Sequence, residues 1–120
     1  MKEKNVKIAV IGLGYVGLPL AIEFSKHFPV IGYDLNSNRI EELKRGFDKT
    51  RELSKDQLIK SDNLVFVSDH KEILKSNVYI VTVPTPVNKN NIPDLKPLKE
   101  ASALVGSNLK KNDLVIYEST

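Results

Sequence analysis

The feature that most constrains the fold of this 120-residue chain is a G-x-G-x-x-G motif that directly follows an apolar, strand-like run. The motif consists of Gly12, Gly14 and Gly17, and a segment of helical character follows it. Gly12 permits a tight turn, Gly14 lets the backbone approach a pyrophosphate, and Gly17 lets a helix lie close against the strand. The N-terminus of that helix would offer N–H groups and a positive dipole to phosphates. Taken alone, the motif is also compatible with a sharp connection that binds nothing.

Short apolar runs recur along the chain, and they are nearly continuous rather than alternating. Such runs are typical of parallel strands that helices cover on both faces. We expect an α/β fold, a Rossmann doubly wound parallel sheet with right-handed crossovers, strand order 3-2-1-4-5 and helices on both faces. The expected strands are Val6 to Ile11, Val30 to Tyr33, Leu64 to Val67, Val78 to Val83 and Leu114 to Tyr117.

Capping residues mark the helices that we expect between these strands. Asn36 can cap a helix that stops at Gly46, and Asp94 can cap the last helix. Ser54 with Gln57 forms a capping box for a further short helix. In the last helix we expect an inward-facing stripe of Leu98, Ala101, Leu104 and Val105.

A carboxylate lies at the position where a dinucleotide-binding fold binds the adenosine ribose. Asp34 ends the second expected strand, about 20 residues after the first glycine of the motif. It can accept hydrogen bonds from both ribose hydroxyls, and its charge repels a 2′-phosphate, which favours NAD over NADP. Arg39 can pack by the adenine or its ribose, and it is the nearby feature that could tolerate NADP. The alternative interpretation of Asp34 is a strand-end turn residue.

Composition excludes several classes of protein. The chain has no cysteine, which removes disulfides, thiolate metal sites and a cysteine nucleophile, and His27 and His70 lack partners at metal-ligand spacing. No apolar run approaches the roughly 18 residues of a membrane span. Because the start lacks a secretory signal, we expect a cytoplasmic protein without a membrane partner. The net charge of +3 comes from 18 basic and 15 acidic residues scattered along the chain, so we expect no nucleic-acid partner.

Three ordered motifs resemble the UDP-glucose/GDP-mannose dehydrogenase family. The segment Gly12 to Pro19 resembles the opening of its NAD-binding domain, Val83 to Pro86 its V-P-T-P loop, and Glu118 to Thr120 the E-S-T that closes its fifth strand. All three fall at carboxyl ends of expected strands, where a doubly wound sheet binds ligands. The resemblance implies that residues 1–120 are one NAD-binding domain, truncated before the middle and C-terminal substrate domains of a parent protein.

Members of this family oxidise the C6 alcohol of a nucleotide sugar to a carboxylate, using two NAD molecules and a covalent thiohemiacetal on a cysteine that lies outside this chain. By resemblance, Tyr15 and Val16 would lie along the pyrophosphate and Thr85 near the middle of the cofactor. Thr120 would sit by the nicotinamide, and it is the catalytic candidate. Thr82 and Thr85 can also be read simply as β-branched strand and turn formers. The implied cofactor-binding residues are Gly12, Gly14, Tyr15, Val16, Gly17, Asp34, Arg39, Thr85 and Thr120.

A finer resemblance concerns the substrate. The segment Gly46 to Leu53 is similar to the G-x-D-x-T-x-E of the branch that acts on UDP-N-acetylhexosamines. It marks kinship with that branch, so we expect a UDP-sugar substrate, and a UDP-N-acetylhexosamine in particular. The family resemblance as a whole implies a homo-oligomeric parent and a role in polysaccharide biosynthesis. The chain alone should be inactive because it has no cysteine. Two alternatives remain open, the cofactor domain of a β-hydroxyacid-type dehydrogenase and a non-catalytic, dinucleotide-sensing regulatory domain of the potassium-channel type.

Overall fold

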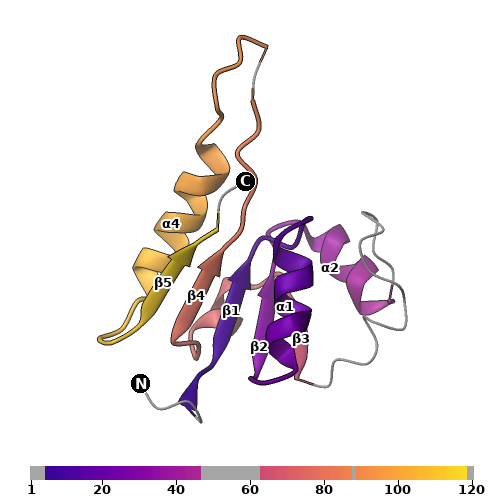
Figure 1. Cartoon of the computed structure of the whole chain (residues 1–120), viewed down its shortest axis with the longest axis vertical. Helices are drawn as coiled ribbons and strands as arrows, with labels where there is room; N and C mark the ends of the chain where they lie inside the picture. Colours follow the sequence, from indigo (N-terminus) through magenta and orange to yellow (C-terminus); the bar gives the residue numbers. More distant parts are fainter. Residues whose placement is uncertain (1–4, 47–62, 88, 119–120) are drawn as a thin grey trace.

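The computed structural model describes residues 5–46, 63–87 and 89–118, which contain one five-stranded parallel sheet in the order β3-β2-β1-β4-β5 (Figure 1). The predicted fold and strand order are therefore confirmed. No helix in these residues is long and apolar enough to cross a membrane. The elements are β1 Ile8–Ile11, α1 Gly17–Ser25, β2 Val30–Tyr33, α2 Ser37–Lys44, β3 Leu64–Val67, the 3₁₀ helix η2 His70–Ile73, β4 Val78–Val81, α4 Lys96–Asn108 and β5 Leu114–Tyr117.

The strands are parallel and pair residue by residue from their first positions, so their carboxyl ends lie at one edge of the sheet. Ile8 pairs with Val30 of β2 on one side and with Val78 of β4 on the other. Leu64 of β3 continues this register beyond β2, and Leu114 of β5 continues it beyond β4. Because the chain turns to one side of β1 first and to the other side afterwards, the switch point of the sheet lies between β1 and β4. Open α/β sheets bind ligands outside the carboxyl ends of the strands at such a point.

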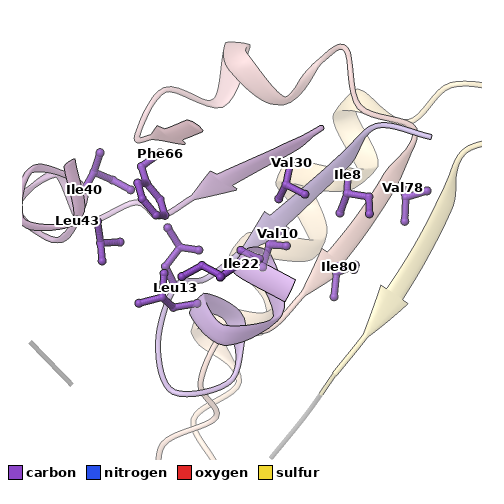
Figure 2. Packing of buried hydrophobic residues seen from close by; sticks show 12 residues of the cluster. Ile8, Val10, Leu13, Ile22, Val30, Ile40, Leu43, Phe66, Val78 and Ile80 are labelled. Carbon is purple, nitrogen blue, oxygen red and sulfur yellow. The ribbon is translucent and has the colours of Figure 1, made fainter. Parts of the chain in front are cut away.

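One face of the sheet packs on α1 and α2. Ile8 and Val10 of β1 share a buried cluster with Leu18 and Ile22 of α1 and with Phe66 of β3 (Figure 2). Ile40 and Leu43 of α2 complete this cluster. Alternate residues of β1 thus point to this face because successive side chains of a strand point to opposite sides.

The other face packs on η2 and α4. Ile11 of β1 and Tyr79 of β4 share a second buried cluster with Ile73 of η2 and with Ala101 and Val105 of α4. The predicted stripe of α4 is confirmed, since its two leucines pack against the same cluster. The domain is therefore a three-layer α/β/α arrangement.

The edge strand β5 is less covered than its continuous apolar sequence predicts. All four residues of β1 and of β4 are buried, whereas Leu114, Ile116 and Tyr117 of β5 are exposed. Within the described residues, the expectation of burial on both faces is wrong for β5, and it also fails at Val65 of the other edge strand, β3, which is 56% exposed. The reason is that β5 has a neighbour on one side only, while α4 packs on the face opposite to Leu114 and Ile116.

The start of α2 agrees with the sequence. The Oδ1 atom of Asn36 accepts the N–H groups of Asn38 at 3.0 Å and Arg39 at 3.3 Å, as an N-cap residue should. Beyond the helix, Gly46 has a φ of 79°, a left-handed conformation that glycine adopts without strain.

The start of α4 differs from the prediction. Its N-cap residue is Leu95 rather than Asp94, and Leu95 makes no side-chain cap. Asp94 instead accepts the N–H of Lys96 at 3.0 Å, which is a local turn that ends where the helix begins. The predicted capping box of Ser54 and Gln57 lies outside the described residues.

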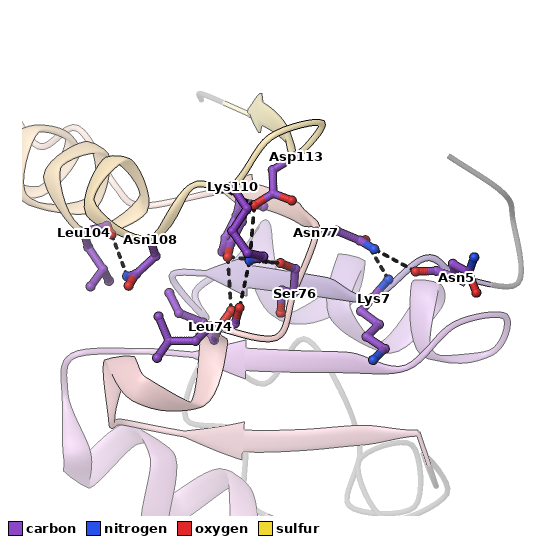
Figure 3. Close-up of polar contacts among 11 residues, drawn as sticks. Asn5, Lys7, Leu74, Ser76, Asn77, Leu104, Asn108, Lys110 and Asp113 are labelled. Carbon is purple, nitrogen blue, oxygen red and sulfur yellow. Dashed lines mark hydrogen bonds and ion pairs between the residues drawn. The ribbon is translucent and has the colours of Figure 1, made fainter.

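Polar contacts close the amino-terminal edge of the sheet, opposite to the switch point (Figure 3). The ammonium of Lys110 donates to the carbonyl oxygens of Leu74 at 2.8 Å and Ser76 at 3.1 Å. It also lies 3.3 Å from the carboxylate of Asp113, whose side chain is almost fully buried. The side chain of Asn77 bonds twice to the main chain that leads into β1. These contacts stabilise the loops at the amino-terminal edge of the sheet.

Candidate functional site

The glycine motif forms the connection from β1 to α1 at the carboxyl edge. Gly12 has a φ of 101°, and its N–H donates to the carbonyl oxygen of Tyr33 at 2.8 Å. A Cβ atom on Gly17 would lie under 3.0 Å from the carbonyl oxygen of Gly12 and from Oγ1 of Thr82. The turn at Gly12 and the close helix packing at Gly17 therefore need glycine. A Cβ on Gly14 would meet nothing within 4 Å, so this residue borders open space.

The first helix begins without a side-chain cap. Val16 is its N-cap residue and makes no side-chain hydrogen bond, and the first turn contains no acidic residue. Tyr15, just before it, is 68% exposed. The first N–H groups of a helix lack partners within the helix, and their dipole attracts negative charge. An anionic group would therefore serve as the cap of α1.

Asp34 follows β2 and bonds directly to the glycine turn. Its Oδ2 atom accepts the N–H of Leu13 at 3.0 Å, and its Oδ1 atom accepts the N–H of Asn36 at 3.0 Å. The second bond is a strand-end turn, so the turn role considered for Asp34 exists alongside its contact with the motif. The two bonds orient the carboxylate, and each oxygen retains capacity for another donor.

Arg39, in the first turn of α2, reaches back to the same loop. Its Nε–H group donates to the carbonyl oxygen of Leu13 at 2.9 Å. Both the N–H and the C=O of Leu13 are therefore held by residues that follow β2. The sequence offered no signal for this contact with the turn, and the adenosine contact expected for Arg39 stays a prediction.

Thr82 is a site residue that sequence reasoning treated only as a strand former. It is buried, and its Oγ1 atom lies 2.6 Å from the carbonyl oxygen of Gly12 and 3.1 Å from that of Ile11. Its hydroxyl thus ties the end of β4 to the glycine turn. The only signal in the sequence was a hydroxyl residue within an otherwise apolar run. β4 ends at Val81, two residues before the predicted Val83.

A cavity of about 490 Å³ opens beside the turn. Most of its lining residues are apolar, and Asp34, His70 and Glu100 of α4 line it as well. Burial raises the pKa of the Tyr33 phenol, and the nearby charges of Asp34 and Asp69 raise it further, so Tyr33 stays neutral there. The lining residues are Ile11, Gly12, Tyr33, Asp34, Leu35, His70, Val83, Pro84, Pro97, Glu100, Ala101 and Leu104. The cavity combines an apolar lining with the Asp34 carboxylate, which two main-chain N–H groups orient, and this combination suits a nucleoside.

Of the other two predicted site residues, Thr85 is described by the structure and Thr120 is not. Thr85 is partly buried on the loop beyond Thr82. Thr120 lies outside the described residues, as does nearly all of the segment Gly46 to Leu53. In the part of the chain that is described, no three histidine, aspartate or glutamate side chains gather as a metal site would require.

The sequence matches a family model and several curated proteins. Residues 6–120 match the family model described as "UDP-glucose/GDP-mannose dehydrogenase family, NAD binding domain". The chain is 51% identical over 117 residues to a UDP-N-acetyl-D-glucosamine 6-dehydrogenase of Pseudomonas aeruginosa, covering 98% of this chain and 28% of that protein. It is 46% identical over 116 residues to Protein CapL of Staphylococcus aureus, covering 97% and 27% respectively.

A solved structure agrees with this match. The structure of a UDP-D-ManNAc dehydrogenase from Pyrococcus horikoshii superposes with a TM-score of 0.86 at 34% identity, covering 96% of this chain and 28% of that one. The chain therefore spans less than a third of the length of the curated relatives that it matches.

Proposed function

The chain belongs to the UDP-glucose/GDP-mannose dehydrogenase family as an NAD-binding domain, and from that premise we propose how its residues hold the cofactor. The pyrophosphate lies at the glycine turn, where Gly14 borders open space and α1 begins without a side-chain cap at Tyr15 and Val16. The adenosine occupies the cavity between β2 and α4, with its ribose hydroxyls on Asp34. Family membership separates the chain from the β-hydroxyacid-type dehydrogenases and the dinucleotide-sensing domains considered above.

The observation that carries this proposal is the orientation of the Asp34 carboxylate. Bonds from Leu13 and Asn36 hold it at the rim of the cavity and beside the turn before any ligand arrives. A fixed negative charge accepts two ribose hydroxyls and repels a 2′-phosphate, which makes NAD the preferred dinucleotide. Thr85 and Thr120 would then lie along the nicotinamide half, with Thr120 as the catalytic candidate.

We further propose that residues 1–120 are the cofactor domain of a longer enzyme that oxidises the C6 alcohol of a UDP-sugar. Bound NAD would supply the hydride acceptor. The named relatives include dehydrogenases of UDP-N-acetyl-D-glucosamine and UDP-N-acetyl-D-mannosamine, which favours a UDP-N-acetylhexosamine as substrate. Oxidation through a thiohemiacetal needs a thiolate, and this chain has no cysteine. The substrate-side wall, the thiolate and the contacts of a homo-oligomer would come from the rest of the parent, a cytoplasmic protein.

Calorimetric titration of the chain with NAD and NADP tests the cofactor proposal. We expect saturable NAD binding and weaker NADP binding. Equal or tighter binding of NADP would contradict the role of Asp34.

A second experiment tests the activity. The chain and its parent are incubated separately with NAD and a panel of UDP-sugars, while NADH is followed by absorbance and the products by mass. We expect uronic acid from a UDP-N-acetylhexosamine with the parent only. NADH formation by the pure chain, or a parent active on UDP-glucose alone, would overturn the assignment.

A further inference from the structure

The residue between the first two glycines, Leu13, is anchored by its main chain and by its side chain. Asp34 accepts its N–H at 3.0 Å, and Nε of Arg39 donates to its carbonyl oxygen at 2.9 Å. Its side chain is 1% exposed and lies in the core on the α1 face. There it rests on Gly32, where a Cβ atom would come within 3.1 Å of the leucine Cδ2 atom. All three anchors belong to β2 or to the residues just after it.

The bond from Arg39 acts on more than Leu13. The carbonyl group of Leu13 belongs to the same planar peptide as the N–H group of Gly14. None of the described peptide bonds is cis, so this C=O and this N–H point in opposite directions. Once Arg39 fixes the direction of the carbonyl, the Gly14 N–H is fixed on the opposite side of the peptide. Gly14 is also the residue whose missing side chain leaves open space.

A connection built around glycines needs such an external restraint. Gly12 and Gly14 flank Leu13, and glycine has more accessible backbone conformations than any other residue. The peptide between Leu13 and Gly14 can therefore rotate at little cost unless its carbonyl is held. A loop that must order on binding weakens affinity, whereas a loop that is already ordered does not.

We propose that Arg39 is a positioning residue, which aims the Gly14 N–H at the pyrophosphate of the dinucleotide by holding the Leu13 carbonyl. The role rests on the proposed NAD site, and it differs from an adenosine contact because Arg39 acts through the main chain of Leu13. Asp34 holds the N–H group of the same residue. Leu13 therefore links the carboxylate that would bind the ribose to the turn that would bind the pyrophosphate.

Three substitutions separate the Nε donor of Arg39 from its charge. In Arg39→Gln, the side-chain amide nitrogen stands at the same number of bonds from Cα as Nε, so the donor remains and the charge is lost. In Arg39→Lys, a carbon takes that place, so the charge remains and the nearest N–H donor lies one bond farther from Cα. Arg39→Met removes both and keeps a stem of similar length. The matched controls are Arg45→Lys and Arg45→Met, because Arg45 lies at the exposed C-terminal end of the same helix.

Calorimetric titration with NAD gives the main readout. We expect Arg39→Gln to bind within about threefold of the unmodified chain, because it retains the donor. Arg39→Lys and Arg39→Met should bind roughly five- to thirtyfold more weakly, the factor that corresponds to losing about 1–2 kcal/mol of binding free energy. Wild-type affinity in Arg39→Lys together with weak binding in Arg39→Gln would show that Arg39 acts through its charge, and it would overturn the proposal. Equal affinity in all variants would overturn it as well.

Amide spectra of the free chain keep this test independent of the cofactor proposal. The Gly14 amide signal of ¹⁵N-labelled protein should move in Arg39→Lys and Arg39→Met, and it should stay near its original position in Arg39→Gln and in both Arg45 variants. An unmoved Gly14 signal in Arg39→Met refutes the positioning role even if NAD binds. If the unmodified chain binds no NAD while the spectra behave as expected, the cofactor proposal fails and the restraint on the turn stands.

Discussion

Replacing Gly17 with alanine should destabilise this domain, although alanine is the better helix former. The added Cβ atom would lie under 3.0 Å from the carbonyl oxygen of Gly12, which is a main-chain atom that cannot rotate away, and from Oγ1 of Thr82. The start of α1 would have to move from the end of β1. That movement would also displace the turn at which we place the pyrophosphate.

The size of the effect follows from three contributions. Inserting a methyl group into a packed contact costs about 1–3 kcal/mol. Displacing Thr82 from its 2.6 Å hydrogen bond to Gly12 adds about 1 kcal/mol. The helix preference of alanine over glycine offsets at most about 1 kcal/mol. We therefore expect a net loss of about 1–3 kcal/mol in the free energy of unfolding.

Urea unfolding followed by circular dichroism measures this loss, and the chain contains its own control. Gly106 lies within α4 with open space where a Cβ atom would be, so Gly106→Ala should stabilise the fold by about 0.5–1 kcal/mol. The two identical substitutions should thus have opposite signs. If Gly17→Ala is neutral or stabilising, the close approach of α1 to the turn is not a real constraint and the reasoning is wrong.

Three further substitutions test other parts of the structure. Gly14→Val should abolish NAD binding in titrations while circular dichroism stays unchanged, because its side chain would enter open space now available to the pyrophosphate. Asp34→Ala should weaken NAD binding and reduce the preference for NAD over NADP, and an unchanged preference would exclude Asp34 as the determinant. Tyr79→Phe should cost about 1 kcal/mol at neutral pH in urea unfolding, because the phenol donates to the carbonyl oxygens of Ile73 and Ser76. Burial raises the pKa of Tyr79 above 10.0, so its contribution is complete below pH 10 and is lost as pH rises through the folded-state pKa. The alkaline loss of stability should therefore be smaller in Tyr79→Phe.

Much of the fold could be predicted because its signals are local. The run Val30 to Tyr33 is a strand with the predicted bounds, and Asn36 caps the helix after it. The exposure of β5 was missed although the predicted strand order places it at an edge, because an apolar run does not reveal which face of its strand a helix will cover. The start of α4 was misplaced by one residue. An aspartate can serve as the N-cap of a helix or as a turn residue just before it, and Asp94 is the turn residue.

The candidate site divides in the same way. The glycine motif and Asp34 have a recognisable spacing, so their meeting at one edge of the sheet could be predicted. The bond between Arg39 and Leu13 could not, because it joins residues 26 positions apart and depends on the direction of a long side chain. Thr82 was missed because a threonine in an apolar run is ordinary for a strand. Spacing indicates which elements meet, whereas the donors and acceptors that face one another depend on the packed geometry.

The residues that hold the glycine turn have a common physical role at the switch point. The strands on both sides of β1 hold the glycine turn, with Asp34 and Arg39 after β2 on one side and Thr82 after β4 on the other. Each contact removes backbone freedom that a cofactor would otherwise have to remove when it binds. A residue that never touches the dinucleotide can therefore change its affinity as much as one that does. Glycine thus supplies the shape that the turn requires, and its neighbours supply the rigidity.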